Sequence, residues 1–430
     1  MTEKAILAGM RFAADAGFDK SMREMKALAE AAGMEVADTF VQDGSAVNPG
    51  TYIGSGKIQE IRAAAEMEQA DVILFNNTLT PMQMKNLVDA FDREIIDRTA
   101  LILRIFAERA GTREARLQVE SANLQYMLPR LAGLHKELGR QGGASGALSN
   151  KGAGETRIEL DRRRIEHRIT ALRGELEVVE RERMTQRKRR NASGIPLVAL
   201  VGYTNAGKST ILNRMLDAYG TEEDKKVLEQ DMLFATLDTT VRSIRPDGGR
   251  RPFLLSDTVG FISNLPTTLV KAFRSTLDEV KYADILCIVS DVSDPEYRED
   301  LKITVDTLKE IGAGEIPRIY VFNKADAAGL SFRGGWFDVN VQGITAEDGR
   351  ITMSAKNPDD ISRLVDLIEN RVNAGRTECT LLIPYTEGRI LTELMHSSDV
   401  KVKEYTAEGT LVHGFLRRED RERYRRFAHS

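Results

Sequence analysis

The chain has 430 residues, an apolar content of 42%, a charged content of 29% and a formal net charge of -4 at pH 7. This length is too great for one ordinary domain, and typical domain sizes suggest about three. The composition is that of a globular protein and excludes a collagen-like, disordered or membrane-embedded chain. The net charge excludes a globally basic nucleic-acid binder, so any contact with RNA must come from a local basic patch.

Cysteine content and the N-terminal residues bear on the compartment. Cys287 and Cys379 lack the spacing of a metal site and do not suggest a disulfide framework. The opening MTEKAILAGM has no apolar run long enough for a signal peptide, and no later stretch is as long as a membrane span. We therefore expect a cytoplasmic monomer without integral membrane insertion, and retain peripheral membrane association as an alternative.

Residues 1–110 alternate apolar runs, such as KAILAGM and DVILFNN, with amphipathic stretches, such as DKSMREMKALAEAAG. That alternation predicts a small N-terminal α/β domain with a largely parallel sheet. The string TYIGSGK, Thr51–Lys57, has too few residues between its first glycine and its GK pair for a phosphate-binding loop. We interpret it as the turn that opens a helix, with a phosphate or RNA contact at Lys57 as the alternative.

Residues 111–194 carry two series of apolar side chains at heptad spacing, which predict two helices packed against each other. Residues 139–154, GRQGGASGALSNKGAG, contain six glycines and predict a loop at the tip of an antiparallel hairpin. We expect arms of about 28 residues, a kink at Pro129, and a second helix capped by Thr156 and Glu159. The first series is Leu117, Leu124, Leu131 and Leu138; the second is Ile158, Ile165, Leu172 and Val179, with Ile169 and Leu176 between them.

The charged residues of the hairpin allow two interpretations. Arg140, Lys151 and Arg157 border the tip and can rest on RNA phosphates without reading sequence. The second arm mixes basic and acidic residues, so a solvated, salt-bridged helix face is the alternative. The run RERMTQRKRRNASGIP, residues 181–196, is interpreted as a linker. The basic residues of the second arm are Arg162, Arg163, Arg164, Arg168 and Arg173.

Residues 195–372 contain short apolar runs that end in polar motifs, namely LVALVG, FLLSDT, ILCIVSD, RIYVFNK and ITMSAK. Buried strands that alternate with helices predict a doubly wound α/β sheet, in which ligands bind at the carboxyl ends of the strands. The polar motifs fall at those ends. We therefore expect one ligand site at this edge of the sheet.

The first of these motifs is GYTNAGKST, Gly202–Thr210, between an apolar strand and a helix-compatible stretch. This context is typical of a P-loop, in which backbone N–H groups surround phosphates, Lys208 reaches the outer phosphates and the Ser209 hydroxyl binds Mg²⁺. The loop residues expected to contact the phosphates are Gly202, Tyr203, Thr204, Asn205, Ala206 and Gly207.

A threonine downstream of the P-loop is expected to bind Mg²⁺ from a switch segment. Thr236, Thr239 and Thr240 qualify by residue type. We favour Thr236 because FATL resembles the FTTL string of ribosome-associated Obg-type GTPases. The neighbours expected to border the nucleotide are Phe234, Ala235, Leu237 and Asp238.

The motif DTVGF places Asp257 at a strand end near the metal, followed by Thr258 and Val259, and lets Gly260 offer its N–H to a terminal phosphate. Phe261 then stands where many GTPases have a water-orienting glutamine. A phenyl ring makes none of the hydrogen bonds that align water, so slow intrinsic hydrolysis is expected. Packing of Phe261 beneath the switch is the structural alternative.

The NKAD and SAK motifs predict a pocket selective for guanine. The Asp326 carboxylate can accept hydrogen bonds from guanine N1–H and N2–H, which adenine does not offer in that arrangement. Asn323, Lys324 and Ala325 would brace the loop and stack on the base. Ser354, Ala355 and Lys356 would close the pocket through a backbone amide to the guanine carbonyl oxygen.

The tail, residues 373–430, combines TLLIP, the amphipathic GRILTELMH and VKVKEYTAEGTLVHGFL. It predicts a small α+β domain. Trp336, the one tryptophan, is interpreted as a packing residue of the preceding domain.

The chain resembles the HflX family of GTPases in GYTNAGKST, LFATLD, DTVGF, NKAD and SAK, and more specifically in GRQGG and GAGETRIELDRRR. The resemblance covers nearly the whole chain. It departs from the family at Thr239, where proline is more usual, and in the loop interior GASGALSN. The resemblance implies a ribosome-stimulated GTPase that binds the large ribosomal subunit and its rRNA, directs the hairpin loop toward the peptidyl transferase centre, and splits stalled or stressed ribosomes.

Two alternatives stay open. One is a ribosome assembly or RNA-remodelling NTPase, which might accept ATP as well as GTP. The other is an RNA-modifying complex in which the N-terminal domain binds a small cofactor. Asn205 also resembles the asparagine of GTPases that bind K⁺ beside the phosphates, where the cation replaces an arginine finger; a loop-stabilising asparagine is the alternative.

Overall fold

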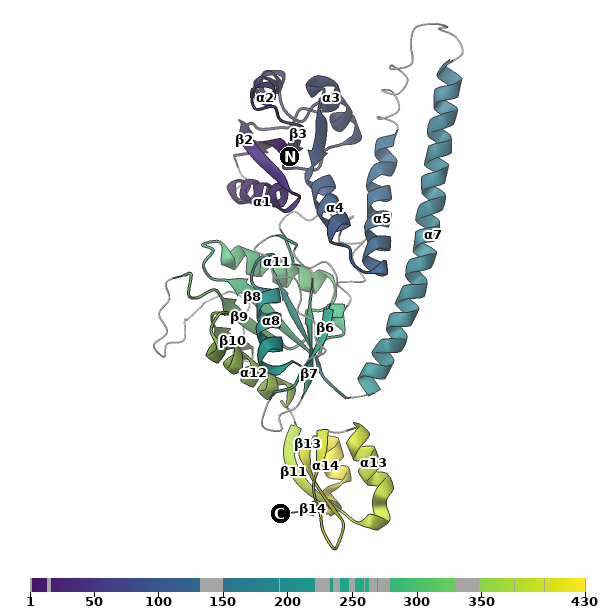
Figure 1. Cartoon of the computed structure of the whole chain (residues 1–430), viewed down its shortest axis with the longest axis vertical. Coiled ribbons are helices and arrows are strands. Elements are labelled where there is room, and N and C mark those ends of the chain that lie inside the picture. Colours follow the sequence, from purple (N-terminus) through teal and green to yellow (C-terminus); the bar gives the residue numbers. More distant parts are fainter. Residues whose placement is uncertain are drawn as a thin grey trace. The chain divides into compact units, whose positions relative to one another are not determined.

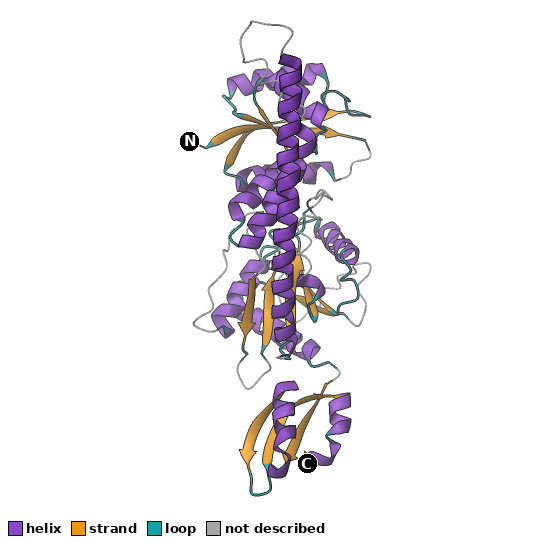
Figure 2. Ribbon diagram, turned by 90° about the vertical axis from the view of Figure 1, so that its right-hand side faces the viewer, coloured by secondary structure: helices purple, strands orange, loops and turns teal. Residues whose placement is uncertain are grey.

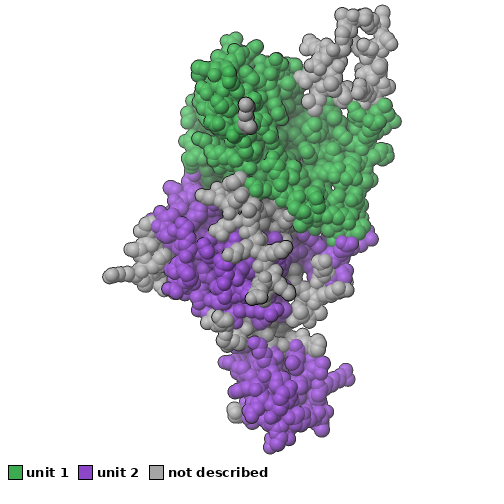
Figure 3. Space-filling model, in the orientation of Figure 1, with its two compact units in different colours: residues 1–179, 230–238, 262–275 green, residues 180–229, 239–261, 276–430 purple. Residues whose placement is uncertain are grey.

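The computed structural model describes thirteen stretches of the chain, whose helices and strands are shown in Figures 1 and 2. They form two compact units, residues 1–179, 230–238 and 262–275 in one and residues 180–229, 239–261 and 276–430 in the other (Figure 3). The described stretches are residues 2–13, 17–131, 150–192, 194–220, 233–234, 240–246, 252–258, 260–262, 269, 279–328, 348–374, 376–397 and 399–429.

The first unit opens with the parallel sheet that the alternating pattern predicts. Its strand order is β2-β1-β3-β4, and every pairing is parallel. TYIGSGK forms the turn before α2, whose N-cap is Gly54, so the interpretation as a helix-opening turn is confirmed. The strands are β1 (Glu3–Arg11), β2 (Met34–Asp43), β3 (Val72–Phe75) and β4 (Glu94–Asp97); the helices are α1 (Phe18–Ala31), α2 (Ser55–Met67), α3 (Pro81–Phe91) and α4 (Arg98–Arg109).

A buried ion pair lies beyond the carboxyl ends of β3 and β4. The Arg98 guanidinium donates to Glu24 Oε2 at 2.7 Å and to Asn76 Oδ1 at 3.0 Å. The Arg98 side chain is 2% exposed and the Glu24 side chain 9% exposed. In open α/β sheets this end of the strands commonly holds a ligand. Here the chain's own side chains fill the position beside Asn76.

The two helices of the hairpin are unequal. The first, α5 (Arg113–Met127), ends before Pro129, which lies in the 3₁₀ turn η1 (Leu128–Arg130). The interruption at Pro129 is therefore confirmed, because proline lacks the N–H that would continue the helix. The expected length of about 28 residues is wrong for the second arm, since α7 (Asn150–Ala192) has 43 residues. The first arm continues past η1 into residues that are not described, so its expected length stays a prediction. Leu138 and Arg140 lie outside the described residues.

Both expected boundaries of the second helix are also wrong. Helix α7 begins at Asn150, so Thr156 and Glu159 lie within it and do not cap it, and residues 150–154 of the expected tip loop are helical. Once nucleated, a helix extends through glycines at modest cost. At its other end α7 continues to Ala192 through the run interpreted as a linker. That run is rich in Arg, Glu, Gln and Lys, which favour helix. The first proline after the start of the run is Pro196, which lies beyond the end of α7.

Helices α5 and α7 pack together within the first unit, as the heptads predict. Leu172 of α7 is 0% exposed and Leu117 of α5 is 7% exposed. The Arg168 guanidinium makes two hydrogen bonds to the Glu120 carboxylate, at 2.7 and 2.8 Å. The apolar stripe thus provides the burial, and the bidentate pair adds an exposed contact between the two helices.

The second unit contains a six-stranded mixed sheet of order β10-β9-β8-β5-β7-β6, in which only the β6–β7 pairing is antiparallel. All five predicted strands are present. β6 was not predicted, because its five residues, TVRSI, are only half-buried at the sheet edge. The strands are β5 (Leu197–Gly202), β6 (Thr240–Ile244), β7 (Phe253–Asp257), β8 (Ile285–Asp291), β9 (Arg318–Asn323) and β10 (Gly349–Thr352); the helices are α8 (Lys208–Tyr219), α11 (Tyr297–Glu310) and α12 (Pro358–Val372).

The tail folds as the expected α+β module. Its sheet is antiparallel with strand order β12-β13-β11-β14, and its core includes Leu381, Leu394, Val412 and Leu416. Across the described part of the chain, no helix is both long and apolar enough to cross a bilayer. The elements are β11 (Arg376–Ile383), η2 (Tyr385–Glu387), α13 (Gly388–Ser397), β12 (Asp399–Tyr405), β13 (Thr410–Arg417), α14 (Arg418–Arg423), η3 (Arg425–Phe427) and β14 (Ala428–His429).

Packing of the hairpin predicts the effect of shortening Leu172. Leu172→Ala should destabilise the protein by about 2 to 5 kcal/mol, because it removes buried methyl groups and leaves a cavity. Leu160→Ala is the matched control, since Leu160 lies on the same helix but is 54% exposed. Thermal unfolding followed by circular dichroism compares them. Equal midpoints for the two variants would contradict the packing of α5 on α7.

Candidate functional site

The P-loop joins β5 to α8 and directs backbone groups toward one point. Gly207 is the N-cap of α8 and has φ +94°, a conformation that other residues rarely adopt. A Cβ there would also collide with Asn323 Nδ2, so the position requires glycine. Helix α8 starts at Lys208, so its unpaired N–H groups and the positive end of its dipole lie at the loop. Such a loop at a helix N-terminus favours a bound anion.

Lys208 is buried in this loop, with only 6% of the residue exposed. Its Nζ donates to the carbonyl oxygens of Gly202, at 3.1 Å, and Tyr203, at 2.8 Å. Burial lowers the pKa of its ammonium group to about 8, and the charge of Asp257 opposes that shift. An anion that binds the loop would favour the charged form of Lys208, because a nearby negative charge stabilises the ammonium group that burial has removed from water.

Ser209 and Asp257 meet at the edge of the loop. The Ser209 hydroxyl donates to Asp257 Oδ2 at 2.7 Å, and Asp257 is 0% exposed at the end of β7. Thr240 faces Asp257 in the β6–β7 pairing. Hydroxyl and carboxylate oxygens are the ligands that Mg²⁺ prefers, usually together with water and phosphate oxygens. No cluster of three or more His, Cys, Asp or Glu suited to a metal occurs among the described residues.

The DTVGF segment is tied to the P-loop through its backbone. Thr204 N–H donates to Phe261 O at 2.7 Å, and Phe261 N–H donates to Gly202 O at 3.1 Å. Gly260 lies so close that a Cβ would stand 2.8 Å from Thr204 Cα and 3.1 Å from Lys208 Nζ. The Phe261 residue is only 3% exposed, which confirms that its ring packs within the domain. Phe261 therefore contributes backbone pairing and packing, and no polar side-chain group.

Asn323 connects three of the predicted motifs. Its Nδ2 donates to Ala206 O, and its Oδ1 accepts from the Ala355 N–H, each at 2.9 Å. Asn323 is 1% exposed at the end of β9. This one amide holds the SAK segment and the P-loop in fixed positions. The bracing role expected of Asn323 is consistent with these contacts.

Asp326 stands beside the SAK segment. It accepts a hydrogen bond from Ser354 Oγ at 2.8 Å, and Lys356 Nζ lies 3.4 Å from its other oxygen. The Ser354 hydrogen bond is the main cause that lowers the pKa of the Asp326 carboxyl, and Lys356 adds to it. Asp326 is therefore held as a carboxylate that can accept two N–H groups.

Two supporting carboxylates were missed from the sequence. Asp291, at the end of β8, lies 2.8 Å from Lys324 Nζ. Asp360 accepts the Ser354 N–H at 3.0 Å and is 4% exposed. Asp291 ends the run ILCIVSD, so its place at a strand end was a usable signal. Asp360 lies in the first turn of α12, and nothing in its local sequence distinguishes it from an ordinary helix-start residue.

The predicted residues of the switch segment are only partly described. Phe234 is in the first unit, where its ring meets Phe106 edge to face at 4.8 Å between centroids. Outside the described residues lie Ala235, Thr236, Leu237, Asp238, Thr239, Val259 and Trp336.

The basic face expected on the second hairpin arm is largely paired with acids. Arg162 lies 2.9 Å from Glu166, Arg163 lies 3.4 Å from Glu159 and Arg164 lies 3.5 Å from Asp161. This pairing favours the interpretation of a solvated, salt-bridged face for the described part of α7. The side chains of Lys151 and Arg157 are outside the description.

Comparison with known proteins covers almost the whole chain. Three family models match: GTP-binding GTPase N-terminal over residues 19–107, GTP-binding GTPase Middle Region over 109–190, and 50S ribosome-binding GTPase over 197–324. GTPase HflX of Caldanaerobacter subterraneus subsp. tengcongensis is 42% identical over 409 residues, which cover 95% of this chain and 90% of that protein. The chain belongs to the HflX family of GTPases.

A second HflX relative, from Lacrimispora saccharolytica, is 38% identical over 416 residues, covering 96% of this chain and 93% of its own. This HflX-family protein hydrolyses GTP, as the named relatives and the GTPase domain show. Among solved structures, a GTP-binding protein from Sulfolobus solfataricus in complex with GDP is 24% identical, with a TM-score of 0.46, over 86% of this chain and 99% of that one.

The geometry of Asp326 in this HflX-family protein predicts a change of base preference. Asp326→Asn should weaken GTP binding at least about 100-fold, because two charge-assisted hydrogen bonds are lost, and should favour xanthosine triphosphate, whose C2 carbonyl accepts from the new amide. Fluorescent derivatives of both nucleotides measure the affinities. Asp359→Asn, an exposed change in the same domain, is the control. A variant at Asp326 that keeps its preference for GTP would contradict the assignment.

Proposed function

We propose that this protein is a magnesium-dependent GTP switch that binds the large ribosomal subunit and dissociates stalled or stressed ribosomes. The observation that carries the proposal is the backbone pairing of Phe261 with Gly202 and Thr204, in a chain of the HflX family. This pairing ties the segment that would sense the terminal phosphate to the loop that would hold it. A GTP-dependent movement of one would therefore be felt by the other.

The nucleotide is assigned to the P-loop and to the motifs that Asn323 connects. Backbone amides of residues 202–207 would surround the phosphates, and Lys208 would exchange its two carbonyl partners for phosphate oxygens. Ser209 and Thr236 would hold Mg²⁺, which neutralises charge on the phosphates. Asp326 would read the guanine edge, with Ala355 at the guanine carbonyl oxygen.

A contact of α7 supports coupling between the nucleotide and the hairpin. Within the second unit, Arg187 of α7 donates to Glu279 Oε1 at 2.8 Å and stacks on Tyr282, with its guanidinium 4.2 Å from the ring centroid. The side chains of Arg187 and Glu279 are 11% and 8% exposed. Breaking such a buried pair is costly, so the two segments should move together. Glu279 lies eighteen residues after Phe261, the last residue of DTVGF. Its contact with Arg187 therefore joins the C-terminal part of α7 to a residue downstream of that motif.

The interpretation as an RNA-modifying complex lacks support in the N-terminal domain. The Arg98–Glu24 pair fills the carboxyl edge of the sheet beside Asn76, where a small cofactor would be expected.

Ribosome dissociation is tested by sedimentation. Intact ribosomes mixed with the protein and GTP should shift toward separate subunits. The reason is that the GTP-bound protein binds the separated large subunit more tightly than the large subunit of an intact ribosome. GDP, and the Lys208→Ala variant with GTP, should leave the ribosomes joined. Ribosomes that stay joined under all three conditions would contradict the proposed function.

Asn205 gives a second prediction, on potassium. Hydrolysis should be at least about tenfold faster in K⁺ than in Na⁺, because a fitted cation stabilises charge in the transition state. Asn205 has φ +59°, which glycine also adopts, so Asn205→Gly removes the side chain without straining the loop and should abolish the difference. Phosphate release measured in the two salts tests both statements. Equal rates for the wild type would refute a potassium site.

A further inference from the structure

The sheet of the C-terminal domain has two edges that are protected unequally. The outer strand β12 carries the exposed Lys401 and Lys403 and has a register shift between Val402 and Glu404. Edge lysines and bulges discourage pairing with a further strand. This edge is therefore poorly suited to pairing with another chain.

The opposite edge is covered over a short distance only. Strand β14 pairs with β11 at Thr380 and Leu381, whereas β11 itself begins at Arg376. Among the described residues, the stretch 376–379 has β13 on one side and no strand on the other. Its Thr377 and Glu378 are exposed. A strand edge of this kind offers unpaired N–H and C=O groups to an incoming chain.

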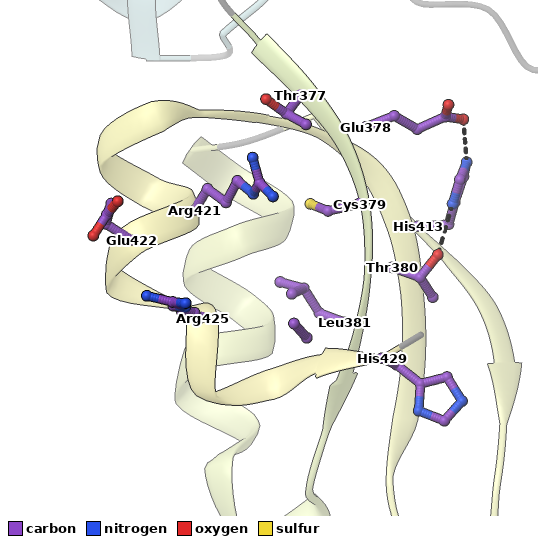
Figure 4. Close-up of a pocket in the computed structure, with 11 residues that line it drawn as sticks. Thr377, Glu378, Cys379, Thr380, Leu381, His413, Arg421, Glu422, Arg425 and His429 are labelled. Atoms are coloured by element: carbon purple, nitrogen blue, oxygen red, sulfur yellow. Dashed lines mark hydrogen bonds and ion pairs between the residues drawn. The ribbon is translucent and has the colours of Figure 1, made fainter.

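A cavity of about 990 Å³ lies along this open edge, between β11 and the helical segment that precedes β14. Side chains alternate along β11, as in any strand. Figure 4 shows Cys379 on the side that faces the helices, and Glu378 and Thr380 on the other side. There His413 bridges Glu378 and Thr380, at 3.1 Å from each, which orders this side of the edge.

The groove is basic on its helical wall. Arg421 and Glu422 of α14 and Arg425 of η3 line it, and all three are exposed. Among the described side chains, neither arginine forms an ion pair, whereas their neighbours Arg423 and Arg426 pair with Glu393 and Glu387. Figure 4 shows Arg421 pointing over Cys379, while Glu422 points away from the strand. The floor is less polar, with Cys379, Leu381 and Ala428.

We propose that this groove binds an extended acidic peptide segment of a partner protein, which adds a strand to β11 along residues 376–379 and places carboxylates on Arg421 and Arg425. Backbone pairing supplies affinity, and the alternating side chains of the added strand supply specificity. Arginine suits the planar carboxylate. An RNA strand matches the arginines but cannot pair with a strand edge, so the open edge favours a peptide. This inference is independent of the function proposed for the nucleotide site.

Cys379 is a natural reporter for the test. It is half-buried in the groove, whereas Cys287 is fully buried, so N-ethylmaleimide should modify Cys379 first. The probe is a blocked hexapeptide of alternating valine and glutamate, added to the full-length protein, with modification followed by mass spectrometry. At ten times its Kd, the peptide should slow the modification of Cys379 about tenfold by mass action.

Two comparisons separate strand addition from simple charge attraction. A hexapeptide of alternating valine and lysine should give no protection to the wild type but should protect the R421E/R425E double variant. Arg423→Glu is the matched control, because Arg423 lies in α14 with Arg421 but pairs with Glu393 at 2.8 Å and does not line the groove.

Methylation of alternate peptide nitrogens on the edge that faces β11 should abolish protection by the acidic peptide.

Three results would overturn the proposal. The first is the absence of protection by the acidic peptide at millimolar concentration. The second is full protection by the peptide that is methylated on the edge facing β11. The third is protection by a single-stranded oligoribonucleotide where the peptide gives none.

Discussion

The two hydrogen bonds between Phe261 and the P-loop are the interaction on which the arrangement of the site depends. They make Gly260 lie against Thr204 and Lys208, where no larger residue fits. The backbone N–H and C=O of Phe261 are both hydrogen-bonded to the P-loop, and the Phe261 residue is buried. A side chain in that position packs and does not orient water. We therefore propose that a bound ion or a partner supplies the stabilisation that residue 261 does not.

The rest of the second unit extends this constraint in two directions. Asn323 joins the P-loop to the SAK segment through one amide, which links the loop proposed to hold the phosphates to the segment proposed to contact the base. Arg187 joins α7 to Glu279, so the hairpin helix is tied to the chain beyond the switch. Both links are buried polar contacts, which tolerate only discrete rearrangements. These links are the basis of the proposed coupling between the nucleotide site and α7.

Sequence reasoning succeeded where the pattern is local. Buried strands that end in polar residues predicted five of the six strands and placed Ser209, Asp257 and Asn323 together, because strand ends of a parallel sheet share one edge. It failed where tertiary contacts decide. The edge strand β6 has too weak an apolar pattern to be predicted. Helix α7 extends beyond both of its expected ends, and the residues beyond its expected C-terminal end favour helix. The partners Asp291 and Asp360, and the backbone pairing of Phe261, are long-range contacts without a sequence signature.

Single-turnover hydrolysis of GTP, measured with and without large ribosomal subunits, tests the central claim that residue 261 supplies no catalytic group. The wild type and Phe261→Gln should both hydrolyse slowly alone, and large subunits should accelerate the wild type about 1000-fold or more, as partner-supplied groups do in other GTPases. Fast hydrolysis by the isolated wild type, or by Phe261→Gln without ribosomes, would contradict the account.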